Sequence, residues 1–276
     1  MTEAQNLHIP TPCLYLVYAT PELPAFDQAT LTSRLQTFPE IQETKHLEVA
    51  QHEPVSTAHW GEIRFGQHHI QFSGLPNPLP NEIIDRTVHT SRWMPQIKMA
   101  MRQHQSHISL VYTGTHHNPI EKMIALYQAA SAFSDENLVG ILNPEAWVAH
   151  PPADFLSTQM IATYRQHLPF SLWFGYIKYF VDKTRFWLVT RGHHIFDVPD
   201  LAYFVQAEDR IESIIRDFNN IFYYIYEEDV FVTAGDTFTL AGSDQKLEFL
   251  EVAEENDFLM GPSGTLVIAH AGANLQ

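Results

Sequence analysis

The chain has 276 residues, of which 45% are apolar and 12% aromatic, so it can fill a folded core and is neither a disordered chain, a collagen nor a coiled coil. Acidic residues outnumber basic residues by 32 to 16, which gives a formal net charge of −16. This charge repels phosphate backbones and anionic lipid, so we expect neither nucleic acid nor a membrane surface as a partner.

The first half of the chain, residues 1–152, predicts alternating strands and helices. We expect strands at 14–18, 47–50, 62–72, 108–113 and 138–142, with Gly66 at a turn or bulge inside the third. We expect helices at 27–38, 81–91, 95–105 and 118–133, with Asp27, Asn81 and Asn118 as capping residues. This pattern favours a mixed sheet with flanking helices.

The clearest helix start is Asn118-Pro119-Ile120-Glu121, which places a capping residue, a proline at the first helical position and a glutamate at the third. Asp209-Arg210-Ile211-Glu212 has a similar order. After it, apolar residues recur at the helical period as far as Ile225, which indicates a long helix with one buried stripe.

The second half, residues 153–276, predicts an α+β unit. Pro151-Pro152 marks the expected joint, although the two halves could also form one compact unit. A helix at 153–167 precedes a hairpin of strands 172–181 and 186–190 around the turn 182–185. The long helix follows, and then short strands at 230–232, 237–240, 248–252 and 265–268. The expected sheet of this half is therefore rich in hairpins.

The chain has one cysteine, Cys13, beside the apolar run 14–18. A single cysteine cannot form an internal disulfide, and the polar segment Met1 to Asn6 does not resemble a secretory leader. No stretch reaches 18 uncharged apolar residues. We therefore expect a cytoplasmic protein in which Cys13 serves as a small buried side chain.

Sixteen histidines are an unusual number, and six of them form adjacent pairs at 68–69, 116–117 and 193–194. None has the spacing of a zinc-binding helix, so we predict no metal site and no cofactor. His104 shares a helix face with Ile97 and Met101, which favours a packed core histidine. We expect most histidines to be exposed and independent; the alternative is a response to pH near 6.

The most distinctive segment runs from Thr190 to Leu201 and contains an isolated arginine, Arg191. Two interpretations stay open. In the structural one, Arg191 forms an internal ion pair with Asp197 or Asp200. In the functional one, Arg191 binds a carboxylate at a rim, with His193 nearby.

The same segment carries a resemblance. Trp187 to Gly192 and Val198 to Leu201, followed by a long amphipathic helix and Gly235-Asp236-Thr237, resemble the DUF4261 domain, a bacterial family of unknown function. The likeness is strongest over residues 170–250. Residues 76–80, which lead to a helix and Trp93, and residues 104–111, which lead into a strand, also look like the region that precedes this domain. Phe196-Asp197 departs from the Phe-Gly of the pattern. The resemblance implies no established activity and no catalytic residue.

No nucleophile elbow, phosphate-binding loop or dinucleotide fingerprint is present in the sequence. We therefore predict a non-catalytic protein that binds another protein or regulates it, of which an immunity protein is one possible type. A second hypothesis is a hydrolase or transferase whose site includes Arg191, His193, Asp200 and Asp236. A third is a structural subunit of a larger assembly.

Overall fold

A computed structural model describes residues 11–24, 27–44, 46–52, 58–152, 156–206, 210–239 and 246–270. The described chain divides into two compact units, residues 11–173 and residues from 174 onward, which we call the N-terminal unit and the C-terminal unit. This division lies later in the chain than the boundary that we expected after Pro152. Each unit has its own sheet and helices, and the α+β class is confirmed.

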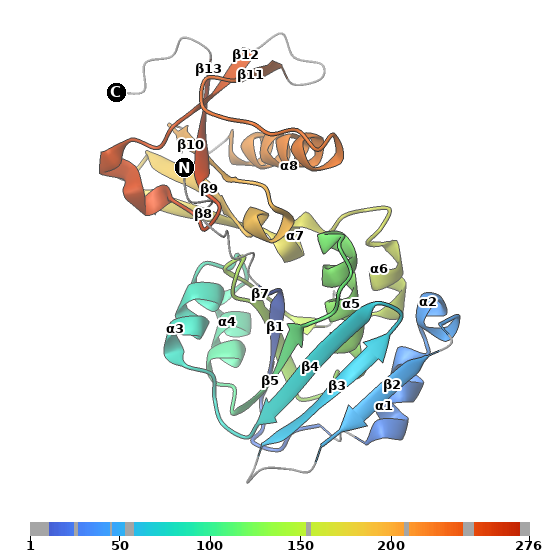
Figure 1. The fold of residues 1–276 in the computed structure, drawn as a ribbon. Coiled ribbons are helices and arrows are strands. Elements are labelled where there is room, and N and C mark those ends of the chain that lie inside the picture. Colours follow the sequence, from blue (N-terminus) through green and yellow to red (C-terminus); the bar gives the residue numbers. More distant parts are fainter. Residues whose placement is uncertain are drawn as a thin grey trace, which may run out of the picture. The chain divides into compact units, whose positions relative to one another are not determined.

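The N-terminal unit is built on a seven-stranded sheet of order β2-β3-β4-β5-β1-β6-β7, in which every neighbouring pair runs antiparallel (Figure 1). The expected strand at 62–72 is two strands, because Gly66 adopts a φ of 56° and reverses the chain. The strands are β1 (Cys13–Tyr18), β2 (Leu47–Gln51), β3 (His59–Phe65), β4 (His68–Leu75), β5 (Ser106–Tyr112), β6 (Leu138–Asn143) and β7 (Val148–His150).

Helices cover both faces of this sheet. Alternate residues of β1 point to opposite faces: Val17 packs among residues of α3, η1 and α4, whereas the hydroxyl of Tyr18 donates to the carbonyl of Phe133 at the end of α5, 3.0 Å away. The helices are α1 (Gln28–Leu35), α2 (Pro39–Gln42), α3 (Asn81–Ile84), the π-helical turn η1 (Asp85–His89), α4 (Pro95–Arg102), α5 (Pro119–Ala132), α6 (Thr158–Thr163) and α7 (Phe170–Trp173). None of the helices in the described ranges is long and apolar enough to cross a bilayer.

Two of the three predicted caps are confirmed. The side chain of Asp27 accepts from the backbone N–H of Thr30, and that of Asn118 accepts from the backbone N–H groups of Ile120 and Glu121. The prediction for Asn81 is wrong: it is the first residue of α3 and follows Pro80, which occupies the cap position without a side-chain bond.

The C-terminal unit has a six-stranded sheet of order β11-β12-β13-β10-β9-β8. Its pair β10–β13 is parallel and its other pairs are antiparallel, so the mixed strand directions that we expected in the N-terminal sheet occur here instead. The strands are β8 (Gly175–Phe180), β9 (Phe186–Arg191), β10 (Asp200–Val205), β11 (Thr237–Thr239), β12 (Lys246–Leu250) and β13 (Thr265–His270).

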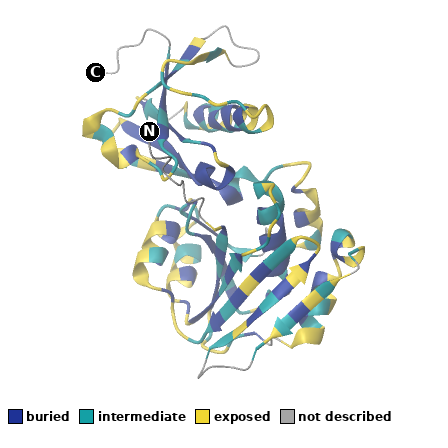
Figure 2. Cartoon of the chain, in the orientation of Figure 1, coloured by how far each residue is buried: buried dark blue, intermediate teal, exposed yellow. Residues whose placement is uncertain are grey.

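The long helix α8 (Ile211–Glu227) is confirmed; its expected cap, Asp209, lies outside the described residues. Its buried stripe faces the sheet, as the dark-blue side of the helix in Figure 2 shows, and consists of Ile214, Phe218, Ile221, Phe222 and Ile225. Two 3-10 segments complete the unit, η3 (His193–Phe196) and η5 (Glu254–Leu259). The second packs through Leu259 against Trp187 and Val189 of β9.

Three predictions for this half are corrected. The expected strand 172–181 begins only at Gly175, because Phe170–Trp173 form α7. The expected helix 153–167 is seen as α6, Thr158–Thr163, and residues 153–155 lie outside the described part. Residues 230–232 form no strand; they follow Asp229, whose φ of 50° turns the chain away from α8.

Candidate functional site

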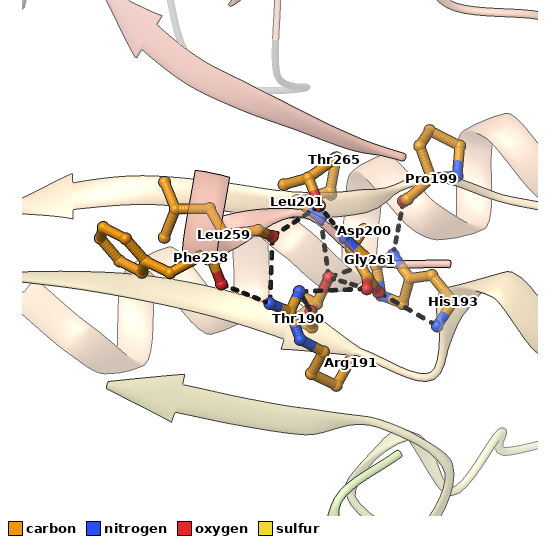
Figure 3. A network of polar contacts seen from close by, with 10 residues as sticks. All are labelled: Thr190, Arg191, His193, Pro199, Asp200, Leu201, Phe258, Leu259, Gly261 and Thr265. Carbon is orange, nitrogen blue, oxygen red and sulfur yellow. Dashed lines mark hydrogen bonds and ion pairs between the residues drawn. The ribbon is translucent and has the colours of Figure 1, made fainter. Parts of the chain in front are cut away.

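The segment between β9 and β10 brings three of the four candidate residues together (Figure 3). Arg191 ends β9, Asp200 begins β10, and His193 lies in η3 between them. Nη1 of Arg191 donates to Oδ2 of Asp200 over 3.2 Å, and the two side chains are only 3% and 1% exposed. Of the partners expected for Arg191, the structure pairs it with Asp200.

The rest of the network satisfies both members of this ion pair. The guanidinium of Arg191 also donates to the carbonyl oxygens of Thr190, Phe258 and Leu259, at 3.1, 3.4 and 3.0 Å. Oδ1 of Asp200 accepts from the hydroxyl of Thr190 and the backbone N–H of His193, both at 3.4 Å. The network therefore fastens the start of β10 to the end of η5.

Gly261 closes the network on its other side. A methyl group on its Cα would overlap Oδ2 of Asp200, so only glycine leaves room for the carboxylate. The backbone N–H of Gly261 donates to the hydroxyl of Thr265, which donates in turn to the carbonyl of Leu259. The backbone of Gly261 therefore encloses the carboxylate of Asp200 on this side.

Burial sets the protonation of the two titratable groups. It raises the pKa of Asp200 to about 6, against the opposing charge of Arg191. It lowers the pKa of His193 to about 3, so the imidazole is neutral. Nδ1 of His193 lies 3.1 Å from the carbonyl of Pro199, and the rings of Phe174 and Phe222 are centred 4.4 and 4.9 Å away. His193 therefore acts as a packed aromatic side chain.

The fourth candidate, Asp236, lies in an exposed turn before β11. Its Oδ2 accepts from the backbone N–H of Thr233 at 2.8 Å and from the hydroxyl of the same residue at 3.1 Å. Within the described part of the chain it shares no hydrogen bond with Arg191, His193 or Asp200. The four residues predicted as one catalytic group are thus a buried trio and a separate surface carboxylate.

The histidines are more buried than we expected. His104, His107, His150, His193 and His194 are each at most 6% exposed. The prediction for His104 is confirmed, since its Nε2 accepts from the N–H of Leu79 and its Nδ1 donates to the carbonyl of Met101. Across the described ranges, no three His, Cys, Asp or Glu side chains come close enough to hold a metal ion.

Two cavities of the C-terminal unit lie on either side of the segment Val230–Val232. One, of 560 Å³, is lined by apolar side chains from Ile225, Val252, Met260 and Leu266 together with the carboxylates of Asp197 and Glu251. The other, of 760 Å³, lies between α8 and the β11–β12 pair. Both are lined by Val230, Phe231 and Val232. We call this segment and the residues lining the two cavities the Phe231 surface.

Phe231 stands between the cavities with 90% of its surface exposed, the largest exposure of any large apolar side chain that the structure describes. Tyr223 and Tyr224 on α8 are also exposed, at 44% and 54%. Single exposed apolar residues are ordinary, but an aromatic group beside two hollows is typical of an interaction site.

The Phe231 surface is acidic as well as aromatic. Glu227, Glu228 and Asp229 are all exposed and lead directly into Val230. In the described part of the chain, the residues that line the two cavities include three acidic ones, Asp197, Asp236 and Glu251, and no lysine or arginine. Sequence reasoning missed this surface because the apolar triplet 230–232 predicted a strand; the acidic triplet before it was the available signal.

A scan of the chain against protein-family models finds no matching family, and searches of curated proteins and of solved structures likewise find no match.

Proposed function

We propose that this protein is a non-catalytic binding protein whose Phe231 surface docks a basic segment of another protein. The supporting observation is Phe231 itself, a phenylalanine left 90% exposed between two cavities. Full burial of such a side chain contributes about 1.5–3 kcal/mol, which is the scale of an interface hot spot.

The charge of the surface selects the kind of partner. Helix α8 ends in Glu227 and has no basic residue in its last turn. Negative charge at a helix C-terminus opposes the helix dipole and costs about 0.3–1 kcal/mol per group. A basic partner would neutralise Glu227, Glu228 and Asp229 and remove this cost. The chain's net charge of −16 would also speed association with such a partner.

The buried trio supports binding over catalysis. Arg191, His193 and Asp200 bond to one another, to backbone groups and to the hydroxyl of Thr190, and none of them lines either cavity of the Phe231 surface. A hydrolase or transferase would need these groups to face a substrate. Their placement instead supports a role in holding the loop between β9 and β10.

Site-specific photocrosslinking tests the proposal. Phe231 is replaced by p-benzoylphenylalanine in the full chain, and the protein is irradiated in a lysate of its source cells. Phe180 provides the matched control, because it is a phenylalanine of the same unit, 61% exposed and outside the Phe231 surface. We expect a crosslink from position 231, absent from position 180, to a lysine- and arginine-rich segment of another protein.

Three results would overturn the proposal: equal crosslinking from both positions, a crosslink to an acidic segment, or a crosslink to a second copy of this chain. The last result would support the alternative of a structural subunit. Once the partner is identified, Phe231→Ala should lower the affinity for it by about 30-fold or more, whereas Phe180→Ala should leave the affinity unchanged.

We also propose a relation to the DUF4261 family and a reducing compartment. The first is supported by Asp197, which adopts a φ of 58° at the position where the family pattern has glycine. The second is supported by Cys13, the single cysteine of the chain. Burial raises the pKa of its thiol to about 12, which keeps it protonated and unreactive.

A further inference from the structure

We propose that the 760 Å³ cavity of the Phe231 surface binds one arginine side chain of the partner. This inference rests on the proposed function and makes it specific. The cavity is lined by residues of α8, β11 and β12, elements that Figure 1 labels, and its lining combines aromatic residues with an aspartate.

Aromatic side chains come from every element around the cavity. Tyr223 and Tyr224 belong to α8, Phe231 to the segment after it, and Phe238 and Phe249 to β11 and β12. The last two rings are stacked, with centroids 4.7 Å apart and planes 24° from parallel, so they form one rigid wall. Aromatic faces attract cations, and a guanidinium binds them best because its plane can stack on a ring.

Asp236 provides the counter-charge. Its two bonds to Thr233 use Oδ2 and fix the carboxylate in the turn before β11. Among the residues that the structure describes, Oδ1 of Asp236 has no hydrogen-bond partner. Asp236 is one of the residues that line the cavity, so we infer that this oxygen accepts from a cation held against the rings.

The end of α8 adds to the negative potential. Glu227 accepts a hydrogen bond from the hydroxyl of Tyr223, so a second carboxylate lies beside one of the aromatic residues that line the cavity. The helix ends here without a basic residue, so its terminal carbonyl groups add to the same potential. Among the described residues that line the cavity there is no lysine or arginine to compete for these groups.

Arginine fits this combination better than lysine does. Its planar group can stack on the Phe238–Phe249 wall while its N–H donors reach a carboxylate at the edge. Lysine presents a strongly hydrated point charge that loses more solvation in an aromatic cavity. A cavity of 760 Å³ also leaves room for the backbone on either side of the bound side chain.

Short peptides test the inference directly. The probes are acetyl-Ala-Arg-Ala-amide, the same peptide with citrulline, and the same peptide with lysine, each titrated into the full chain and followed by amide NMR shifts. Citrulline keeps the shape of arginine without its charge. We expect the arginine peptide to shift resonances of α8 and β11 and to bind roughly ten-fold more tightly than the citrulline peptide.

Two variants complete the experiment. Asp236→Asn keeps an oxygen for the bonds to Thr233 but removes the charge, and should weaken arginine binding about ten-fold. Asp257→Asn makes the same charge change at an exposed position that lines neither cavity, and should leave binding unchanged.

Equal binding of the arginine and citrulline peptides, shifts that map outside the cavity, or an unaffected Asp236→Asn variant would overturn the inference. Equal binding of the lysine peptide would overturn the choice of guanidinium. If the arginine peptide fails while position 231 still crosslinks a basic segment, the proposed function stands and only this inference falls. If both fail, the proposed function falls as well.

Discussion

Removing the carboxylate of Asp200 is the sharpest test of the buried ion pair. In Asp200→Ala, the guanidinium of Arg191 would stay 97% buried in the protein without its counter-charge, since its own exposure is only 3%. Breaking one side of a buried pair typically costs about 3–5 kcal/mol. That loss is a large part of the 5–15 kcal/mol by which a domain is typically stable.

The contacts of Asp200 explain why this loss of stability is large for a single substitution. The carboxylate accepts from Arg191, from the hydroxyl of Thr190 and from the backbone N–H of His193. Each buried donor left without an acceptor costs about 1–3 kcal/mol. The double variant Arg191→Met with Asp200→Leu removes both charges, so it should recover about 2 kcal/mol of the loss. Because the double variant also removes the guanidinium that donates to the carbonyls of Phe258 and Leu259, it recovers only part of the lost stability.

The assay is urea unfolding followed by circular dichroism, with hydrogen exchange of the β9 and β10 amides to assign the change to the C-terminal unit. Asp257→Ala, an exposed aspartate of the same unit, is the control and should change the free energy of unfolding by less than about 0.5 kcal/mol. If Asp200→Ala unfolds at the same urea concentration as the control, or if the double variant is less stable than Asp200→Ala, the reasoning is wrong.

Three further predictions follow from single features. Gly261→Ala should destabilise the C-terminal unit by about 1–3 kcal/mol in urea unfolding, because its methyl overlaps the carboxylate of Asp200; an unchanged midpoint contradicts the close approach. Asp197→Gly should stabilise the same unit by up to about 1 kcal/mol, because glycine adopts a φ of 58° with less strain; a loss of stability would show that the aspartate side chain contributes more than its strain costs. Burial lowers the pKa of His150 to about 3, below its unfolded value near 6.5, so the stability that it contributes is present above pH 6.5 and is lost as the pH falls toward 3. His150 alone should therefore cost the N-terminal unit about 2 kcal/mol between pH 7.5 and 5, measured by tryptophan fluorescence in Trp187→Phe, which leaves tryptophans only in that unit; equal midpoints at the two pH values would refute this.

The sequence predicted those elements well that depend on interactions between residues close together in the chain. The cap at Asn118 and the stripe of α8 depend on residues three or four positions apart, so they could be found from spacing alone. The strand β10 was missed because Pro199 and Asp200 are typical of a loop, whereas here Asp200 is buried by its pairing with Arg191. A contact across nine positions of the chain cannot be deduced from periodicity.

The candidate site shows the same limit. One interpretation of the sequence was that Arg191 forms an internal ion pair, and the structure pairs Arg191 with Asp200. Nothing in the sequence indicated that Asp236 lies apart from this pair. Its position depends on the path that the chain takes after α8, which periodicity does not reveal. The apolar triplet around Phe231 predicted a short strand, but Phe231 is 90% exposed, since hydrophobicity favours burial and does not show where a chain leaves its sheet.

The position of β13 has a consequence for how the protein is made. Thr265–His270 is the last strand that the structure describes, yet it lies inside its sheet between β10 and β12. A nascent chain that has reached only residue 260 therefore contains β10 and β12 but not β13. The edges of β10 and β12 that pair with β13 then have no partner. Such edges are prone to wrong pairing, so the C-terminal sheet can close only after β13 has been synthesised, and until then its open edges need protection from other strands.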